Sequence, residues 1–384
     1  MKIRAWGVAW AAILALAGCS TVSDVYERVA GPRPKVAPLP DFQPLAAARV
    51  IWQGQVGVAG RYVFVPAVAG DGVWAAGEAG QIVRFELGGG QSSRRIEAQQ
   101  RLSAGVGADR ERVVVGTPKG EVLAFDAGGA LKWKTAVSSE VLSPPQIAEG
   151  IVVVRSGDGR IFGLNAADGK RKWVYQRPSS PALTIRSVAG VVMDRGGVFA
   201  GFPGGKLVAL DLQSGLIGWE ATVALPKGAT ELERVTDVVG LPVVRDTEVC
   251  AVAYQGRVAC FDPRSGAQQW SRDISSTAGL VGAGGHLYVT DDRDAVLALD
   301  WRSGASVWKQ TQLAGRQLTA PAVAGDYLAV ADGQGFVHFL RREDGAFAAR
   351  VPTDGSPVTA PPQPIEGGVL VQTRNGTLAA LAVR

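Results

Sequence analysis

Three features of the sequence predict an all-β fold, an eight-bladed β-propeller of four-stranded antiparallel blades whose ring is closed by an N-terminal strand. A seven-residue phrase recurs eight times, turn glycines separate short Val/Leu/Ala runs, and one strand-like segment stands alone before the first copy. Glycine accounts for 50 of the 384 residues, which is well above the usual share of about 7%. The glycines are spread along the chain, so they indicate turns rather than a disordered tract.

The recurring phrase consists of a turn residue, one variable residue, four mostly apolar residues and usually an acid. Its copies begin at Gly80, Gly120, Gly159, Gly205, Gly256, Asp294, Gly335 and Gly376. The successive spacings are 40, 39, 46, 51, 38, 41 and 41 residues. A period of this size with several strands per repeat is typical of a propeller. A β-rich run precedes each copy, so each blade is expected to contain a hairpin with a tight turn.

A tryptophan follows five of the copies at the same place, four residues after a glycine. These residues are Trp133, Trp173, Trp219, Trp270 and Trp308. They could be platforms on which a ligand stacks. A register that repeats in five blades favours the other interpretation, in which each indole packs between neighbouring blades.

The two ends of the repeat region predict how the ring closes. The last copy ends at Arg384 without room for a fourth strand, while residues 47–52 form an isolated β-rich run. We therefore expect a propeller over residues 47–384 in which the N-terminal strand completes the eighth blade. Closure of this kind pairs strand edges that would otherwise be exposed.

The N-terminus has the features of a lipoprotein signal peptide. Lys2 and Arg4 precede an apolar stretch of 14 residues, 5–18, which is shorter than the roughly 20 that a membrane-spanning helix needs. Small residues before Cys19 predict cleavage after residue 18 and lipid on Cys19, against the alternative of an ordinary secretory signal with a chance cysteine. Ser20 resembles the pattern of lipoproteins forwarded to the outer membrane. Residues 19–46, rich in proline, would be a lipidated tether.

Charge and cysteine content narrow the function further. Without the signal peptide the chain has 38 basic and 35 acidic residues and no basic run, which does not favour nucleic acid as a partner. Cys250 and Cys260 flank a predicted hairpin turn. They either form a disulfide or remain two buried thiols, and neither alternative makes them catalytic.

The blade phrases, followed by Gly and Trp, look like the repeats of quinoprotein dehydrogenases. Together with the lipobox and eight repeats in under 400 residues, they resemble the BamB family, lipoprotein subunits of the outer-membrane β-barrel assembly machinery. The resemblance implies a non-catalytic subunit without a cofactor or metal, anchored at the periplasmic face of the outer membrane. It also implies binding to the POTRA domains of BamA and assistance in inserting β-barrel proteins.

Two loops carry the more specific part of this resemblance, and they account for the two longest spacings. Leu183, Ile185 and Arg186 match the Leu-x-Leu-Arg sequence with which the family binds BamA, with Ile in place of the second Leu. Asp237 matches the second loop, but Val239 stands where the family more often has another acid. The alternatives are that Arg186 is a solvated surface charge and Asp237 a turn former.

Two other functions remain open at this point: a pyrroloquinoline quinone enzyme and a general scaffold of the cell envelope. The chain lacks a Cys-Cys pair and has only His286 and His338. The acidic run 291–294 could be imagined as a calcium site, although its position favours a hairpin turn. A further hypothesis is that outer blade strands pair with unfolded outer-membrane protein clients by β-augmentation.

Overall fold

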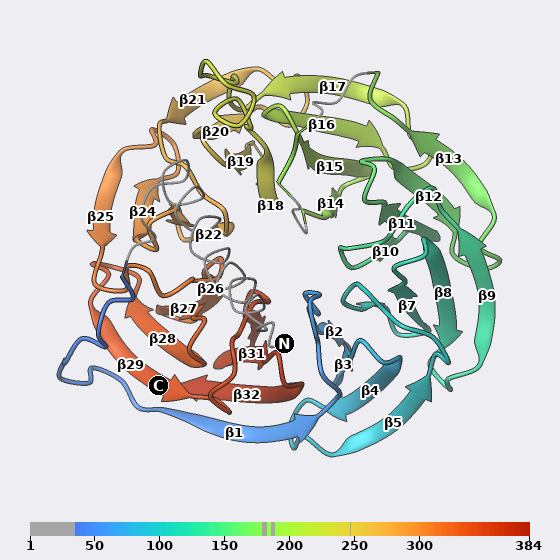
Figure 1. Cartoon of the computed structure of the whole chain (residues 1–384), viewed down its shortest axis with the longest axis horizontal. Coiled ribbons are helices and arrows are strands. Elements are labelled where there is room, and N and C mark those ends of the chain that lie inside the picture. Colours follow the sequence, from blue (N-terminus) through green and yellow to red (C-terminus); the bar gives the residue numbers. More distant parts are fainter. Residues whose placement is uncertain (1–34, 179–182, 186–188, 246) are drawn as a thin grey trace, which may run out of the picture.

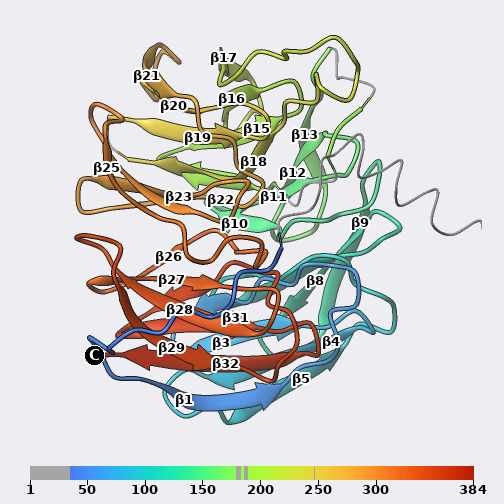
Figure 2. The same cartoon turned by 60° about the vertical axis from the view of Figure 1, so that its left-hand side comes forward.

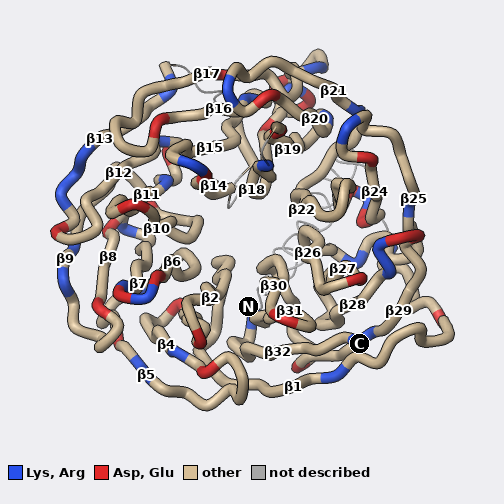
Figure 3. The backbone as a smooth tube through the Cα atoms, turned by 180° about the vertical axis from the view of Figure 1, so that it is seen from behind, with Lys and Arg blue, Asp and Glu red and all other residues tan. Residues whose placement is uncertain are grey.

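The computed structural model describes residues 35–178, 183–185, 189–245 and 247–384, and these residues form eight four-stranded antiparallel sheets. The sheets are arranged as blades around a ring (Figure 1). This confirms the predicted eight-bladed propeller. Lys and Arg are interspersed with Asp and Glu around the ring (Figure 3). Within the described ranges, no helix has the length and apolar character needed to cross a bilayer.

Each blade begins with its innermost strand and ends with its outermost one. Blades 1 to 4 consist of β2 (Ala67–Ala69), β3 (Gly72–Ala76), β4 (Gln81–Glu86), β5 (Ser92–Glu97); β6 (Gly107–Ala108), β7 (Arg112–Gly116), β8 (Glu121–Asp126), β9 (Leu131–Ala136); β10 (Gln146–Ala148), β11 (Ile151–Arg155), β12 (Ile161–Asn165), β13 (Arg171–Tyr175); and β14 (Val191–Asp194), β15 (Gly197–Phe202), β16 (Lys206–Asp211), β17 (Ile217–Thr222).

The second half of the ring repeats this order, except in the last blade. Blades 5 to 8 consist of β18 (Val238–Val244), β19 (Val249–Ala253), β20 (Val258–Phe261), β21 (Gln268–Arg272); β22 (Gly279–Ala283), β23 (His286–Thr290), β24 (Val296–Asp300), β25 (Ser306–Gln310); β26 (Ala322–Ala324), β27 (Tyr327–Ala331), β28 (Phe336–Arg341), β29 (Phe347–Pro352); and β30 (Gln363–Ile365), β31 (Gly368–Gln372), β32 (Thr377–Val383), β1 (Ala48–Gln55).

The ring closes as predicted, with the N-terminal strand as the outer strand of blade 8. β1 runs antiparallel to β32, so that Ala48 lies opposite Val383 and Gln55 lies opposite Thr377. The middle strands of the blades are almost entirely buried, because both of their faces pack against neighbouring blades. Closure places β1 and β32, which are far apart in sequence, side by side in one sheet. The edge of β32 is therefore paired where the ring closes.

The repeated tryptophans join neighbouring blades, which confirms the packing interpretation. Each indole Nε1 donates a hydrogen bond of 2.8–3.0 Å to a backbone carbonyl of the next blade. Trp133, for example, donates to Ala166, and a glycine of the same turn covers its ring. That glycine, Gly169, has a φ of +71°, and a Cβ there would lie 2.6 Å from the Trp133 ring. This contact between blades therefore requires both Trp133 and Gly169.

The propeller has two faces, which we name by their connections. The long-loop face carries the segments that join each outer strand to the next blade, and the longest of these are residues 176–190 and 223–237. The short-turn face lies opposite and carries the turns between first and second strands and between third and fourth strands. The two longest repeat spacings, 46 and 51 residues, thus correspond to insertions on one face.

Cys250 and Cys260 form a disulfide, which decides between the two alternatives left open by the sequence. They lie directly opposite each other on β19 and β20, with their Cα atoms 4.1 Å apart, and both are fully buried. The disulfide lies in the core between blades 5 and 6, together with Val239 and Leu287.

Candidate functional site

The residues singled out by the two loop motifs lie on the long-loop face of blades 3 to 5. Leu183 and Ile185 belong to loop 176–190, between β13 and β14, and Asp237 ends loop 223–237, next to β18. Arg186 and Cys19 lie outside the described residues, as does the predicted signal peptide. The structure therefore brings one part of each motif together and leaves Arg186 and Cys19 as predictions.

Asp237 ties the two loops to each other. Its carboxylate Oδ2 accepts a 2.6 Å hydrogen bond from the backbone N–H of Ile185, and Oδ1 accepts one of 3.3 Å from Gly204. The side chain is 2% exposed. Burial raises the pKa of Asp237, and the two N–H groups and nearby Arg155 offset only part of this effect. Asp237 is thus more than a local turn former, because it fixes a loop that lies 52 residues away in sequence.

Arg155 supports this arrangement and was missed by the sequence analysis. Its guanidinium donates to Gly201 O at 2.6 Å and lies 4.9 Å from the centre of the Phe202 ring. Burial lowers the pKa of Arg155 to about 10, while its attraction to Asp237 acts in the opposite direction. A second guanidinium, that of Arg177, lies 5.7 Å from the same ring. No sequence signal marks Arg155, because it ends an ordinary buried strand.

The two apolar residues of the first motif have different positions. Leu183 is 47% exposed, whereas Ile185 is partly buried and packs against the core cluster that contains the disulfide. Of these two residues, only Leu183 is therefore available at the surface as an apolar anchor. Ile185 secures the loop from beneath, since its backbone is held by Asp237 and its side chain by the core.

Further leucines are exposed around the same loops. Leu225 and Leu232, both in loop 223–237, are 65% and 52% exposed, and Leu241 at the start of blade 5 is 49% exposed. Glu233 orders this loop by accepting the backbone N–H groups of Ala229 and Thr230 at 2.8 and 3.1 Å. Exposed leucines on an ordered loop are typical of protein-binding surfaces. Only Leu232 carries a signal in the sequence, as a single leucine between Glu231 and Glu233, whereas Leu225 and Leu241 have apolar neighbours.

The buried position of Val239 gives a physical reason why this chain lacks the second acid of the loop motif. Its side chain is 2% exposed and packs in the core between blades 5 and 6 with Cys250 and Leu280. A carboxylate buried in this apolar core would lose its hydration. In this chain, position 239 therefore contributes to the core of blade 5 rather than to a charged surface.

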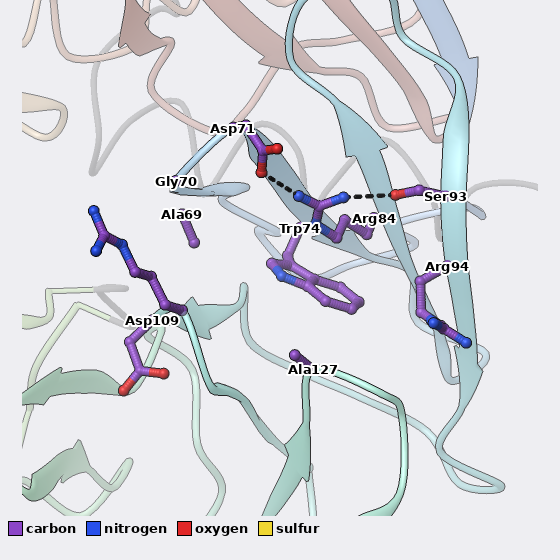
Figure 4. Close-up of a pocket in the computed structure, with 10 residues that line it drawn as sticks. Ala69, Gly70, Asp71, Trp74, Arg84, Ser93, Arg94, Asp109 and Ala127 are labelled. Atoms are coloured by element: carbon purple, nitrogen blue, oxygen red, sulfur yellow. Dashed lines mark hydrogen bonds and ion pairs between the residues drawn. The ribbon is translucent and has the colours of Figure 1, made fainter.

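Two of the cavities formed by the described residues lie on the short-turn face. The one in Figure 4 has a volume of about 490 Å³ and lies between blades 1 and 2 on the short-turn face, where Trp74 and Arg84 line it. The Arg84 guanidinium is already neutralised, since it lies 2.5 Å from carboxylate oxygens of both Asp71 and Glu86. A similar cavity of about 460 Å³ lies between blades 5 and 6, beside Trp301. Both are on the face opposite Leu183.

The acidic run 291–294 is a hairpin turn between β23 and β24. Asp291 Oδ1 accepts the backbone N–H groups of Arg293 and Ala295 at 3.0 and 2.8 Å. Asp294 accepts those of Gln317 and Leu318, which joins blade 6 to the loop before blade 7. These carboxylates are engaged by backbone donors. Among the described residues, no group of three or more His, Cys, Asp or Glu side chains is placed to hold a metal ion.

Comparison with known proteins gives consistent results over almost the whole chain. The family described as "Outer membrane protein assembly factor BamB" matches residues 73–310. A protein of that name from Bordetella pertussis is 44% identical over 378 residues, which cover 98% of this chain and 96% of the relative.

Solved structures agree with the fold. The crystal structure of BamB from Moraxella catarrhalis has a TM-score of 0.79 and 27% identity, and the match covers 88% of this chain and all of that one. A quinohemoprotein alcohol dehydrogenase from Pseudomonas putida HK5 has a TM-score of 0.68 and 13% identity, covering 90% of this chain and 78% of the enzyme. At that identity the enzyme shares only the fold with this chain.

Proposed function

The chain belongs to the BamB family of outer membrane protein assembly factors, and from this premise we propose that its long-loop face binds the periplasmic POTRA domains of BamA. As a member of this family it is a non-catalytic factor associated with the outer membrane and the BAM complex. The quinoprotein alternative is thereby set aside, although the blades of such enzymes have the same architecture.

The observation that carries the proposal is the tie between the two loops. Asp237 holds the backbone at Ile185, and Ile185 packs on the core, so Leu183 is presented from a fixed base. A preorganised anchor loses less conformational entropy on binding than one on a free loop. Leu225 and Leu232 extend the apolar surface around it. Arg186 would add charge-assisted hydrogen bonds to an acidic group of the partner.

The anchor to the membrane is a second part of the proposal. Cleavage after residue 18 would leave Cys19 as a lipidated N-terminus, which would place the propeller at the periplasmic face of the outer membrane. Two or three acyl chains, at about 0.8 kcal/mol per buried methylene, suffice for stable attachment. Globomycin-sensitive processing and its loss in Cys19→Ser would support this part, and release of the unaltered chain into the soluble periplasm would contradict it.

A pull-down of BamA from detergent-solubilised envelopes tests the binding surface. The tagged chain would be compared with Leu183→Ala, Arg186→Ala and Asp237→Ala, with folding checked by circular dichroism. The matched control is Leu131→Ala, because Leu131 is 54% exposed on the outer strand of blade 2, away from the long loops. We expect BamA to be lost or strongly reduced with the three loop variants and retained with the control. Equal recovery with all four would contradict the proposed surface.

A further inference from the structure

Residues 37–46, which we call the strap, lie along the outside of blade 7 (Figure 2). The backbone N–H of Ala37 donates to Ala314 O at 2.8 Å, and those of Leu45 and Ala46 donate to Ala348 O at 2.9 and 3.1 Å. Between these points, the Phe42 ring stacks on that of Phe347 with their centres 5.3 Å apart. The strap is thus bound at both ends and in the middle.

The outer strand of blade 7 differs from other outer strands because the strap covers it. In β9 and β13 most residues are exposed, and Lys132, Lys134, Arg171 and Lys172 face the solvent. In β29, by contrast, Phe347, Ala348, Ala349 and Val351 are buried. The sequence of β29, Phe-Ala-Ala-Arg-Val-Pro, is correspondingly apolar. This strand is therefore built to receive a segment of the chain.

Two arginines hold the strap through its carbonyl groups. Arg316 donates to Ala37 O at 3.0 Å, and Arg350 donates to Pro40 O at 2.8 Å. The Arg350 guanidinium also lies 5.0 Å from the centre of the Phe42 ring. Cations that hold backbone carbonyls in a partly buried place make stronger hydrogen bonds than neutral donors.

Both arginines are themselves fixed by a buried pair in blade 7. Asp332 is fully buried, and its Oδ2 accepts from Arg316 at 2.7 Å and lies 3.0 Å from His338 Nε2. Arg350 Nε donates to His338 Nδ1 at 3.2 Å. The neutral imidazole with hydrogen on Nε2 satisfies both contacts, since it donates to Asp332 and accepts from Arg350. The propeller core thus positions the two groups that grip the strap.

The direction of the strap decides from which face the chain leaves the propeller. β1 starts at the short-turn face, where Ala48 pairs with Val383. The strap leads back from there, and Ala37 bonds to loop 311–321 on the long-loop face. A six-residue strand such as β29 is about 20 Å long. The strap therefore shifts the point at which the chain leaves the propeller across the full height of blade 7.

We propose that the strap is a built-in device that delivers the N-terminal lipid anchor to the long-loop face, the face that also carries Leu183 and the partner-binding loops. The consequence for the anchor rests on the proposed lipidation of Cys19, whereas the strap itself does not. The segment 19–36 can span at most about 60 Å when fully extended. A docked strap therefore limits how far the long-loop face lies from the membrane and keeps that face on the side of the anchor.

Cross-linking in the purified chain tests the exit face without lipid or BamA, so its outcome is independent of the proposed function. Cys19→Ser prevents lipidation, and Val36→Cys is combined either with Gln312→Cys on the long-loop face or with Glu343→Cys on the short-turn face. Val36 is 53% exposed, and both partner positions are exposed. With a short bifunctional maleimide, we expect the 36–312 product to predominate.

The strap is then released by Phe42→Ala together with Arg350→Gln, and Arg341→Gln serves as the control because its guanidinium pairs with exposed Asp344 instead. Release should abolish the preference for the 36–312 product, and the control should keep it. Equal cross-linking to both faces with the strap intact, or a preference that survives its release, would overturn the proposal. Should the release variant fail to fold, amide exchange in the unaltered chain decides, because rapid exchange at Ala37, Leu45 and Ala46 would also overturn it.

Discussion

Two buried aspartates hold segments on the long-loop face, and they do so by different chemistry. Asp237 accepts the backbone N–H of Ile185 directly, and burial raises its pKa. Burial would also raise the pKa of Asp332, but hydrogen bonds from His338, the Phe336 N–H and Arg316 outweigh it and lower that pKa. The loop that presents Leu183 is thus held by neutral donors, whereas the strap is held through charges. The comparison shows two ways of fixing an irregular segment to the propeller, one through backbone N–H groups and the other through buried charges.

The largest expected effect comes from removing the charge that organises blade 7. Asp332→Ala leaves the guanidinium of Arg316, which is 5% exposed, without its carboxylate. Breaking a buried pair of this kind costs about 3–5 kcal/mol of unfolding free energy. Denaturant unfolding measures it, with Asp344→Ala as the control, because Asp344 forms an exposed pair with Arg341 that solvent screens and that contributes little to stability. Equal effects of the two variants would show that Asp332 has no special role.

A smaller effect is expected at Asp237. Asp237→Ala leaves the N–H groups of Ile185 and Gly204 without their acceptor, at a cost of about 1–3 kcal/mol. Asp237→Asn should cost less, because it keeps one acceptor oxygen and removes a charge that burial disfavours. Unfolding and amide exchange at Ile185 measure both variants. A loss from Asp237→Ala that exceeds the loss from Asp332→Ala would reverse the ranking of the two sites.

Acidification should loosen the strap. Burial lowers the pKa of His338, with Arg350 and Arg316 acting in the same direction and Asp332 opposing them. The folded state therefore binds this proton less readily than the unfolded chain. The stability that the neutral imidazole contributes is present above about pH 6.5 and is lost as the pH falls below that value.

The measurement is amide exchange at Ala37, Leu45 and Ala46 between pH 7.5 and 5, corrected for the intrinsic pH dependence of exchange. Protection should fall with pH in the unaltered chain. It should change less in His338→Gln, in which the titrating group is absent. Protection that is equally insensitive to pH in both proteins would show that His338 does not govern the strap.

The repeats made most of the fold predictable. Each blade encodes its own hairpin and its tryptophan, so periodicity alone indicated eight blades, and the isolated β-rich run at residues 47–52 indicated the closure that β1 makes with β32. Contacts between distant segments could not be read in this way. The proline-containing residues 19–46 suggested an extended tether, yet residues 37–46 dock on blade 7. The unusually apolar outer strand β29 was the available signal.

The candidate site was predictable only in part. The two longest repeat spacings indicated that both motif loops are insertions on one side of the propeller, but the motifs did not indicate that Leu183 is exposed while Ile185 is packed against the core, because a loop has no period from which to assign an inside. Nor did they predict the hydrogen bond from Ile185 to Asp237, which joins residues 52 positions apart. Arg155 carried no pattern of its own. Such features depend on how blades 3 to 5 meet.

Site-specific photo-cross-linking in intact cells tests the central claim most directly. A photoreactive residue would replace Leu183 on the long-loop face or Leu131 on the outer strand of blade 2, two leucines of similar exposure. The proposed function predicts a cross-link to BamA from position 183 and none from position 131. A BamA cross-link from position 131 alone, or none from either position in a correctly localised chain, would contradict it.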